Sequence, residues 1–242
     1  MYSRRDPASP WGTRVYYETS EFETMMEEAM LRVGSDVFVE GAGVDVDRVL
    51  FKGFDVEADY VDLPAGLLGR TLFHRDGTAH VEVSRQLAEA AEVDTVQRRR
   101  LRSTLAHEGG HLACHGQLFV MDDGTLSLFP EGEEEIPPSI LCRSSSIGTP
   151  GYSGEWWEFQ ANQCMACLLL PRRLLRRHYH SILESLSLVD YVDAVRQDRQ
   201  DELVRGLADL FDVSWQLVLI RLKNLGYAPS EHDLAQTTLN PK

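Results

Sequence analysis

The stretch TLAHEGGHLACH, residues 104–115, gathers side chains that can bind a metal ion. His107 and His111 are four residues apart, so on a helix they lie on one face and can hold one ion together. Glu108 projects to the side of that face, where a carboxylate can act on metal-bound water without binding the metal. This H-E-x-x-H arrangement is the signature of zinc proteases.

A catalytic zinc site usually takes a third protein ligand and leaves one position for water. His115 is a poor candidate, because eight residues of helix place it about 12 Å from His107. The longer H-E-x-x-H-x-x-G-x-x-H form also fails, because Cys114 and Gln117 stand at its glycine and histidine positions. We therefore expect a carboxylate from another helix.

The segment EWWEFQANQCMACLLL, residues 155–170, offers two such carboxylates. Glu158 begins a helical face that continues through Asn162, Met165 and Leu169. A buried carboxylate there needs compensation, which a metal ion can give. Glu155 lies near the same face, so the spacing alone leaves both residues open.

Composition and charge limit the class of protein. The 242-residue chain is 43% hydrophobic and carries a net charge of -14, which argues against general binding to nucleic acid or to anionic membranes. The first residues contain no apolar signal sequence, and four cysteines do not indicate a disulfide scaffold. We expect a cytoplasmic protein with reduced thiols.

Hydrophobic periodicity divides the chain into a mixed first half and a helical second half. Residues 1–20 are polar and predicted to be irregular, and Asp76-Gly77 predicts a hairpin turn. The expected helices are 22–33, 84–93, 95–115, 155–170, 171–186 and two within 201–229; the expected strands lie within 37–40, 48–63 and 70–84; a long loop covers 117–154.

Three blocks resemble the ImmA/IrrE-type metallopeptidases: RRRLRSTLAHEGGHLACH, WEFQANQCMACLLLP and LADLFDVSWQLVLIRLKNLG. The resemblance covers most of residues 75–227. It implies that His107, His111 and Glu158 bind Zn²⁺ and that Glu108 is the general base. Cys164 departs from the family pattern, where phenylalanine is common.

The fold implied by this resemblance is α+β, a zincin-like core in which a small sheet packs on the active-site helices, with a helical C-terminal subdomain. We expect an N-terminal segment (1–35), a metallopeptidase domain (36–195) and a helix-turn-helix-like subdomain (196–242). The implied function is site-specific intracellular cleavage of a partner protein, such as a helix-turn-helix repressor.

The resemblance also gives the paired glycines of the motif a role. Each costs about 1 kcal/mol relative to alanine inside a helix. Gly110 matches a family glycine, and we expect another backbone to pack closely against the helix there. Gly109 stands where the family usually has a larger apolar residue, and it either extends this contact or loosens the helix.

Three further features bear on the reaction. By analogy with other zinc proteases, strand 80–84 is the expected edge strand that pairs with an extended substrate. Donors of suitable type for an oxyanion are Tyr152, His178, Tyr179 and His180, which the sequence does not rank. Cys142, and the pair Cys164 and Cys167, are alternative metal ligands by type.

The C-terminal block supports a rival function. A short helix, a turn at Phe211-Asp212 and an N-cap at Ser214 are typical of a helix-turn-helix. The alternative is therefore a DNA-binding regulator with a degenerate peptidase site. The second helix offers few polar contacts for DNA, namely Gln216, Arg221, Lys223 and Asn224.

Overall fold

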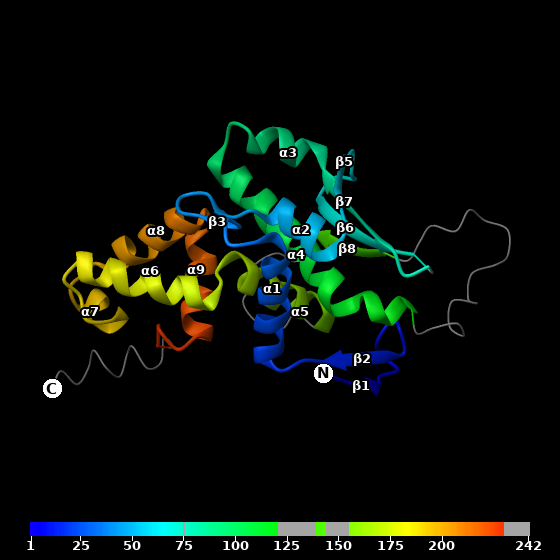
Figure 1. Ribbon diagram of the computed structural model, residues 1–242, viewed down its shortest axis with the longest axis horizontal. Coiled ribbons are helices and arrows are strands. Elements are labelled where there is room, and N and C mark those ends of the chain that lie inside the picture. The colour runs from blue at the N-terminus through cyan, green and yellow to red at the C-terminus, as the bar shows by residue number, and fades with distance from the viewer. Residues whose placement is uncertain (75, 121–138, 144–154, 230–242) are drawn as a thin grey trace. The chain divides into compact units, whose positions relative to one another are not determined.

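The computed structural model describes residues 1–74, 76–120, 139–143 and 155–229. The chain is α+β, with small sheets in its N-terminal part and mostly helix after them (Figure 1). It divides into two compact units: unit 1 comprises 1–37 and 46–168, and unit 2 comprises 38–45 and 169–242. Within the described ranges, no helix is both long enough and apolar enough to cross a membrane.

Unit 1 is built on a four-stranded sheet in the order β5-β7-β6-β8. The strands are β5 (Ala58–Val61), β6 (Leu67–Phe73), β7 (Ala79–Ser84) and β8 (Ser139–Arg143). β6 and β7 form the predicted hairpin, with Gly77 at a φ of 85° in the turn. β5 runs parallel to β7, and β8 runs antiparallel to β6.

The sheet order overturns the prediction for strand 80–84. β7 pairs with β5 on one side and with β6 on the other, so its backbone groups already have partners. A substrate segment cannot add to it. Among the described residues, the edges of this sheet are β5 and β8. The prediction was wrong because β5 pairs with β7 in parallel, which the sequence does not indicate.

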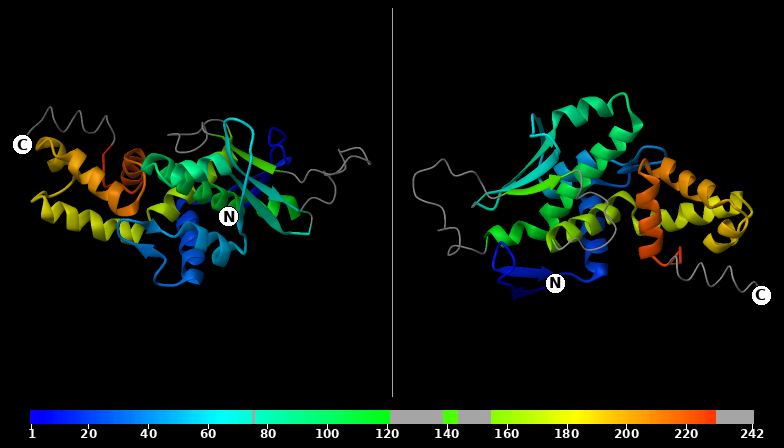
Figure 2. Two further views of the ribbon diagram at one scale, coloured as in Figure 1. Left: turned by 90° about the horizontal axis from the view of Figure 1, so that it is seen from above. Right: turned by 180° about the vertical axis from the view of Figure 1, so that it is seen from behind.

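The helices of unit 1 surround the long helix that carries the H-E-x-x-H motif. They are α1 (Thr19–Val33), α2 (Val46–Phe54), α3 (Arg85–Ala91), α4 (Thr95–Val120) and α5 (Trp156–Leu169). α4 packs along β6, β7 and β8, while α2 packs against α4 and α1 against α2 (Figures 1 and 2). α4 is therefore held by both a sheet and a helix.

Three local predictions for unit 1 were wrong. The predicted loop 117–154 contains the last residues of α4 and the strand β8, which pairs with β6. Residues 48–54 belong to α2 and are not a strand, because the buried residues Val46, Val49, Leu50 and Gly53 follow helical spacing. Residues 1–20 contain a hairpin of β1 (Tyr2–Arg5) and β2 (Thr13–Tyr16).

Buried apolar contacts hold this hairpin. Val15 lies in a cluster shared by the hairpin, the sheet, α4 and α5, whose buried members are Val15, Phe73, Leu118, Phe119, Ile140 and Trp156.

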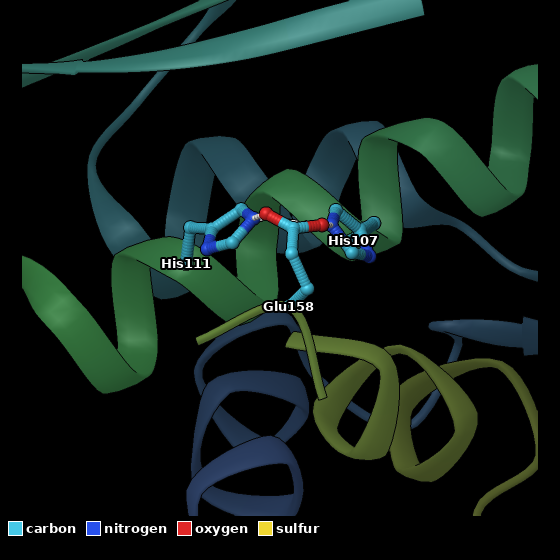
Figure 3. A group of neighbouring side chains, drawn as sticks. All are labelled: His107, His111 and Glu158. Carbon is cyan, nitrogen blue, oxygen red and sulfur yellow. Dashed lines mark hydrogen bonds and ion pairs between the residues drawn. The ribbon is translucent and has the colours of Figure 1, made fainter. Parts of the chain in front are cut away.

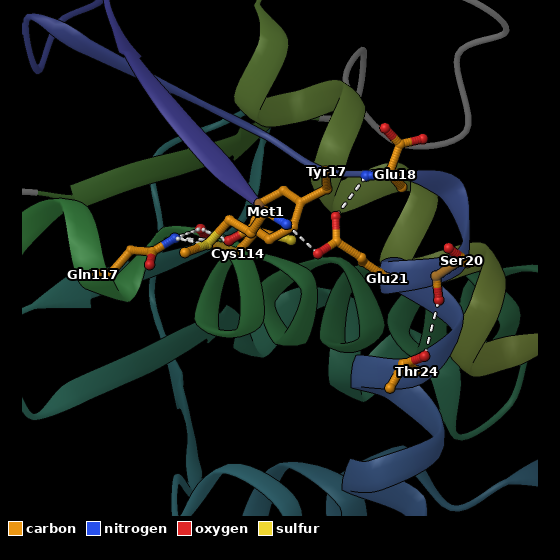
Figure 4. A network of polar contacts seen from close by, with 8 residues as sticks. All are labelled: Met1, Tyr17, Glu18, Ser20, Glu21, Thr24, Cys114 and Gln117. Atoms are coloured by element: carbon orange, nitrogen blue, oxygen red, sulfur yellow. Dashed lines mark hydrogen bonds and ion pairs between the residues drawn. The ribbon is translucent and has the colours of Figure 1, made fainter.

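A polar network also ties the N-terminal segment to α4 (Figure 4). The Tyr17 hydroxyl donates to the Cys114 carbonyl at 2.9 Å, and the Gln117 amide donates to the Tyr17 hydroxyl at 2.8 Å. The N-terminal amine contacts the Glu21 carboxylate on α1. The first twenty residues are therefore anchored to the motif helix by both apolar and polar contacts.

Unit 2 is a set of short helices with one small hairpin. Its elements are β3 (Phe38–Val39), β4 (Gly43–Val44), α6 (Arg172–Ser185), α7 (Tyr191–Arg196), α8 (Gln200–Phe211) and α9 (Trp215–Asn224). The predicted turn between α8 and α9 is confirmed: Asp212 is left-handed at a φ of 50°, and the Ser214 side chain accepts from the Leu217 N–H. The division into three domains stays a prediction.

Candidate metal centre

The motif helix α4 places its two histidines side by side in the interior. His107 and His111 are both 0% exposed, and their Nε2 atoms lie 3.0 Å apart. Four residues of helix put the second ring one turn beyond the first on the same face. The helix alone therefore supplies two nitrogen ligands aimed at one point.

Glu158, in the first turn of α5, completes the group (Figure 3). Its Oε2 lies 3.1 Å from His107 Nε2, and its Oε1 lies 3.5 Å from His111 Nε2. The ligand atoms of these three side chains all lie within 4.8 Å of one another, close enough to hold a metal ion. Glu155 is exposed and does not join them.

Burial and proximity set the protonation of this group. Burial acts to raise the pKa of Glu158, but the adjacent His107 and His111 side chains outweigh it and hold that pKa below its usual range. Burial lowers the pKa of His111 to about 4. Burial also acts to lower the pKa of His107, but the Glu158 carboxylate outweighs burial, so the pKa of His107 is raised. Glu158 is therefore an anion, and His111 is neutral near pH 7.

These residues could hold a metal ion. Two imidazole nitrogens and one carboxylate form the three-ligand set found in catalytic zinc sites, which leave a further position for water. Neutral His111 and ionised Glu158 are in the states that a metal requires, whereas the raised pKa of His107 favours a charged ring that must lose its proton when an ion binds. A metal-binding group needs at least three histidine, cysteine or acidic side chains close together. Within the described part of the chain, His107, His111 and Glu158 form such a group.

Glu108 faces the sheet from the same turn of α4. Its Oε2 accepts a hydrogen bond of 2.5 Å from the Thr71 hydroxyl, and the side chain is 0% exposed. Gly69 leaves room for it, because a Cβ at that position would lie 2.8 Å from Glu108 Oε1. β6 therefore supplies both the space and a donor for this carboxylate.

Sequence reasoning did not identify the two β6 residues. Thr71 is fully buried within a strand, and Gly69 adjoins an irregularity in the pairing of β6 with β8. A glycine inside a strand often marks a place where another group approaches closely. This signal was available in the LLGRT segment, but it does not say which group approaches.

The two glycines of the motif each face another helix. A Cβ on Gly110 would lie 2.7 Å from the Ala161 carbonyl oxygen and 2.9 Å from its Cα, so the backbone of α5 occupies that space. A Cβ on Gly109 would lie 3.2 Å from Leu50 Cδ2 of α2. The predicted close backbone contact at Gly110 is confirmed, and Gly109 packs against a side chain.

The cysteines lie apart from the triad's ligand atoms. Cys114 and Cys164 are buried free thiols, with their Sγ atoms 3.4 Å apart between α4 and α5. Cys167 is also buried and is a reduced thiol. The side chain of Cys142 and the whole of Tyr152 lie outside the described residues.

The remaining oxyanion candidates belong to unit 2. His178 and Tyr179 are buried, His178 beside Phe38 and Tyr179 beside Tyr227. His180 is exposed on α6. These contacts give the two buried residues packing roles within their own unit.

The structure thus brings together His107, His111 and Glu158 as a buried group that could bind a metal ion, consistent with a metal-dependent activity. A comparison of the chain with known protein families and with characterised proteins found no match.

Proposed function

We propose that this protein is a zinc-dependent peptidase of the ImmA/IrrE type. The observation that carries the proposal is the convergence of His107, His111 and Glu158 from two helices on one point. Glu108 follows the first ligand directly in the chain, as in the zinc-protease motif. The three converging side chains would hold the ion, and Glu108 would act beside it.

The chain's own residues account for proton transfer. Bound zinc would supply a Lewis acid that polarises the scissile carbonyl and activates water. The Glu108 carboxylate accepts the proton from that water and returns it to the leaving amine. The Thr71 hydroxyl holds one oxygen of this carboxylate at 2.5 Å, which fixes the direction in which the base points.

An extended substrate would pair with a different strand from the one predicted. β8 is the edge strand next to β6, whose residues Gly69 and Thr71 contact Glu108. We therefore assign the substrate to the β8 edge, where strand addition satisfies its backbone groups. The ligand side chains are buried, so a segment has to reach into an enclosed site. This supports selective cleavage over general proteolysis.

The partner that suits this protein is a basic regulator. A net charge of -14 favours encounter with a positively charged protein, such as a helix-turn-helix repressor. We expect one or a few cuts in a cognate repressor and poor digestion of casein. Co-expression with candidate repressors, followed by mapping of fragment ends, tests this assignment; efficient casein digestion contradicts it.

The alternative, a DNA-binding regulator with a degenerate site, draws support from the α8-turn-α9 arrangement. However, Arg221 is 2% exposed, and its Nε donates to the Leu170 carbonyl at 3.1 Å. Of the four polar residues that could contact DNA, the exposed ones are Gln216, Lys223 and Asn224. One cation on this helix is weak support for DNA binding. Tight duplex binding without proteolysis would establish this alternative.

Metal content and hydrolysis test the site directly. The purified protein should hold about one zinc per chain, and His111→Ala should abolish binding because one of three ligands is lost. His180→Ala, at an exposed histidine, is the matched control and should keep the metal. Glu108→Gln should also keep the metal and lose cleavage. Full zinc content in His111→Ala would refute the site.

A further inference from the structure

A chain of buried hydrogen bonds extends from the far side of His111 (Nδ1) away from the three ligand atoms. His111 Nδ1 lies 3.0 Å from His115 Nδ1, and His115 Nε2 lies 3.1 Å from the Gln160 amide oxygen. The Gln160 amide nitrogen then donates to the Val15 carbonyl at 2.7 Å. His115 is 0% exposed and Gln160 is 5% exposed. These hydrogen bonds link α4, α5 and the N-terminal hairpin.

The Val15 carbonyl fixes the direction of the two hydrogen bonds that Gln160 makes. The Val15 carbonyl can only accept, so the Gln160 NH₂ faces it and the amide oxygen faces His115. An amide oxygen is an acceptor, so His115 Nε2 must carry a hydrogen. The orientation of Gln160 is therefore set by its partners.

The protonation of His115 decides which nitrogen donates in its bond to His111. His115 is 0% exposed, and its two ring nitrogens contact a neutral amide and another imidazole, so neither partner compensates a buried charge and the ring is neutral. A neutral ring with hydrogen on Nε2 has a bare Nδ1. His111 Nδ1 must then be the donor in the pair, which leaves His111 Nε2 with its lone pair.

We propose that His115 and Gln160 are positioning residues that hold His111 in the Nδ1–H tautomer, with its Nε2 lone pair directed at the metal. The inference rests on the metal site of the proposed function, but it needs no peptidase activity. It also gives His115 a role: too distant to share the ion with His107, it contacts the other nitrogen of the second ligand. Such outer partners fix the orientation and tautomer of a ligating imidazole.

The first test reads the tautomers in the metal-free protein. Long-range ¹H–¹⁵N correlation spectra of the uniformly labelled chain distinguish Nδ1–H from Nε2–H imidazoles. We expect His111 as Nδ1–H and His115 as Nε2–H near pH 7, with His115→Asn used to assign the signals. An Nε2–H tautomer of His111 would overturn the proposal, whatever the activity of the protein.

The second test removes Gln160, which joins His115 to the Val15 carbonyl through hydrogen bonds. Gln160→Leu keeps a similar size but can neither accept from His115 nor donate to Val15, so the tautomer preference of His111 should be lost. Zinc affinity, measured by chelator competition, should fall by about 10- to 100-fold. Gln117→Leu is the matched control: it is the same change on α4 outside the chain of bonds, and it should leave the tautomers and zinc affinity unchanged.

The outcomes separate this inference from the proposed function. Unchanged tautomers and zinc affinity in a folded Gln160→Leu variant, with circular dichroism showing the fold, would refute the positioning role. Loss of affinity together with the tautomer change supports it, even where no protein substrate is cut. Loss of zinc binding in both Gln160→Leu and Gln117→Leu would indicate general damage to the packing of α4 and overturn the assignment to Gln160.

Discussion

Gly110→Ala is the substitution that most directly tests how the metal ligands are held together. Inside a helix, alanine is favoured over glycine by about 1 kcal/mol. At Gly110, however, the new Cβ would lie 2.7 Å from the Ala161 carbonyl oxygen, against 3.4 Å or more for ordinary contact. The atom in the way is backbone, so it moves only if α5 moves as a whole.

The expected effect follows from these distances. Overpacking of this kind costs about 1–3 kcal/mol, which offsets or exceeds the gain in helix propensity. α5 has to retreat by about 0.7 Å from α4, and Glu158 retreats with it. Metal sites tolerate errors of only about 0.2 Å in ligand distances. Gly110→Ala should therefore weaken zinc binding more than it destabilises the fold.

Gly109→Ala provides the matched control. It gains the same helix propensity, but its Cβ would meet the end of the Leu50 side chain at 3.2 Å, which can rotate away. Urea unfolding of the metal-free proteins and zinc competition compare the two variants. We expect Gly109→Ala to match or exceed the parent in stability, with Gly110→Ala about 1–3 kcal/mol below Gly109→Ala. Equal stability and equal zinc affinity in the two variants would refute this account of the glycine pair.

Two further predictions concern the carboxylate and pH. Glu158→Ala should strongly weaken zinc binding while Glu155→Ala, at an exposed position, has a minor effect; the reverse order in chelator competition would contradict the site. The pKa of His111 is lowered from 6.5 to about 4, so its contribution to stability is complete above pH 6.5 and is lost as pH falls toward 4. This is worth about 3 kcal/mol. Urea midpoints of the metal-free protein should fall between pH 6.5 and 4.5, and less so in His111→Gln; an equal fall in both would contradict the prediction.

Much of the site could be predicted because its signals are local. Helical spacing by itself brings His107 and His111 to one face, and the Asp76-Gly77 pair fixes a hairpin turn. The turn before Ser214 is likewise set by a few adjacent residues. Such features depend on the covalent chain and on neighbours within one or two turns.

Residues 48–54 show where a prediction from local sequence alone failed. Their apolar residues are dense enough to resemble a strand, and only packing against α1 and α4 decides in favour of a helix. The prediction of β7 as an edge strand failed for the same reason. Its parallel partner β5 is separated from it in the sequence by the whole of β6. Strand order depends on long-range pairing, which alternating residues do not encode.

The sequence by itself determined that two histidines and a glutamate share one helix. Spacing left the third ligand open between Glu155 and Glu158, and the family resemblance favoured Glu158. The tertiary structure brings Glu158 to the histidines, because the backbone of α5 packs against Gly110. The same crossing brings Gln160 to His115, although 45 residues separate them. Helix periodicity is a property of the chain, whereas contact between two helices depends on side-chain volumes that meet only when the protein is folded.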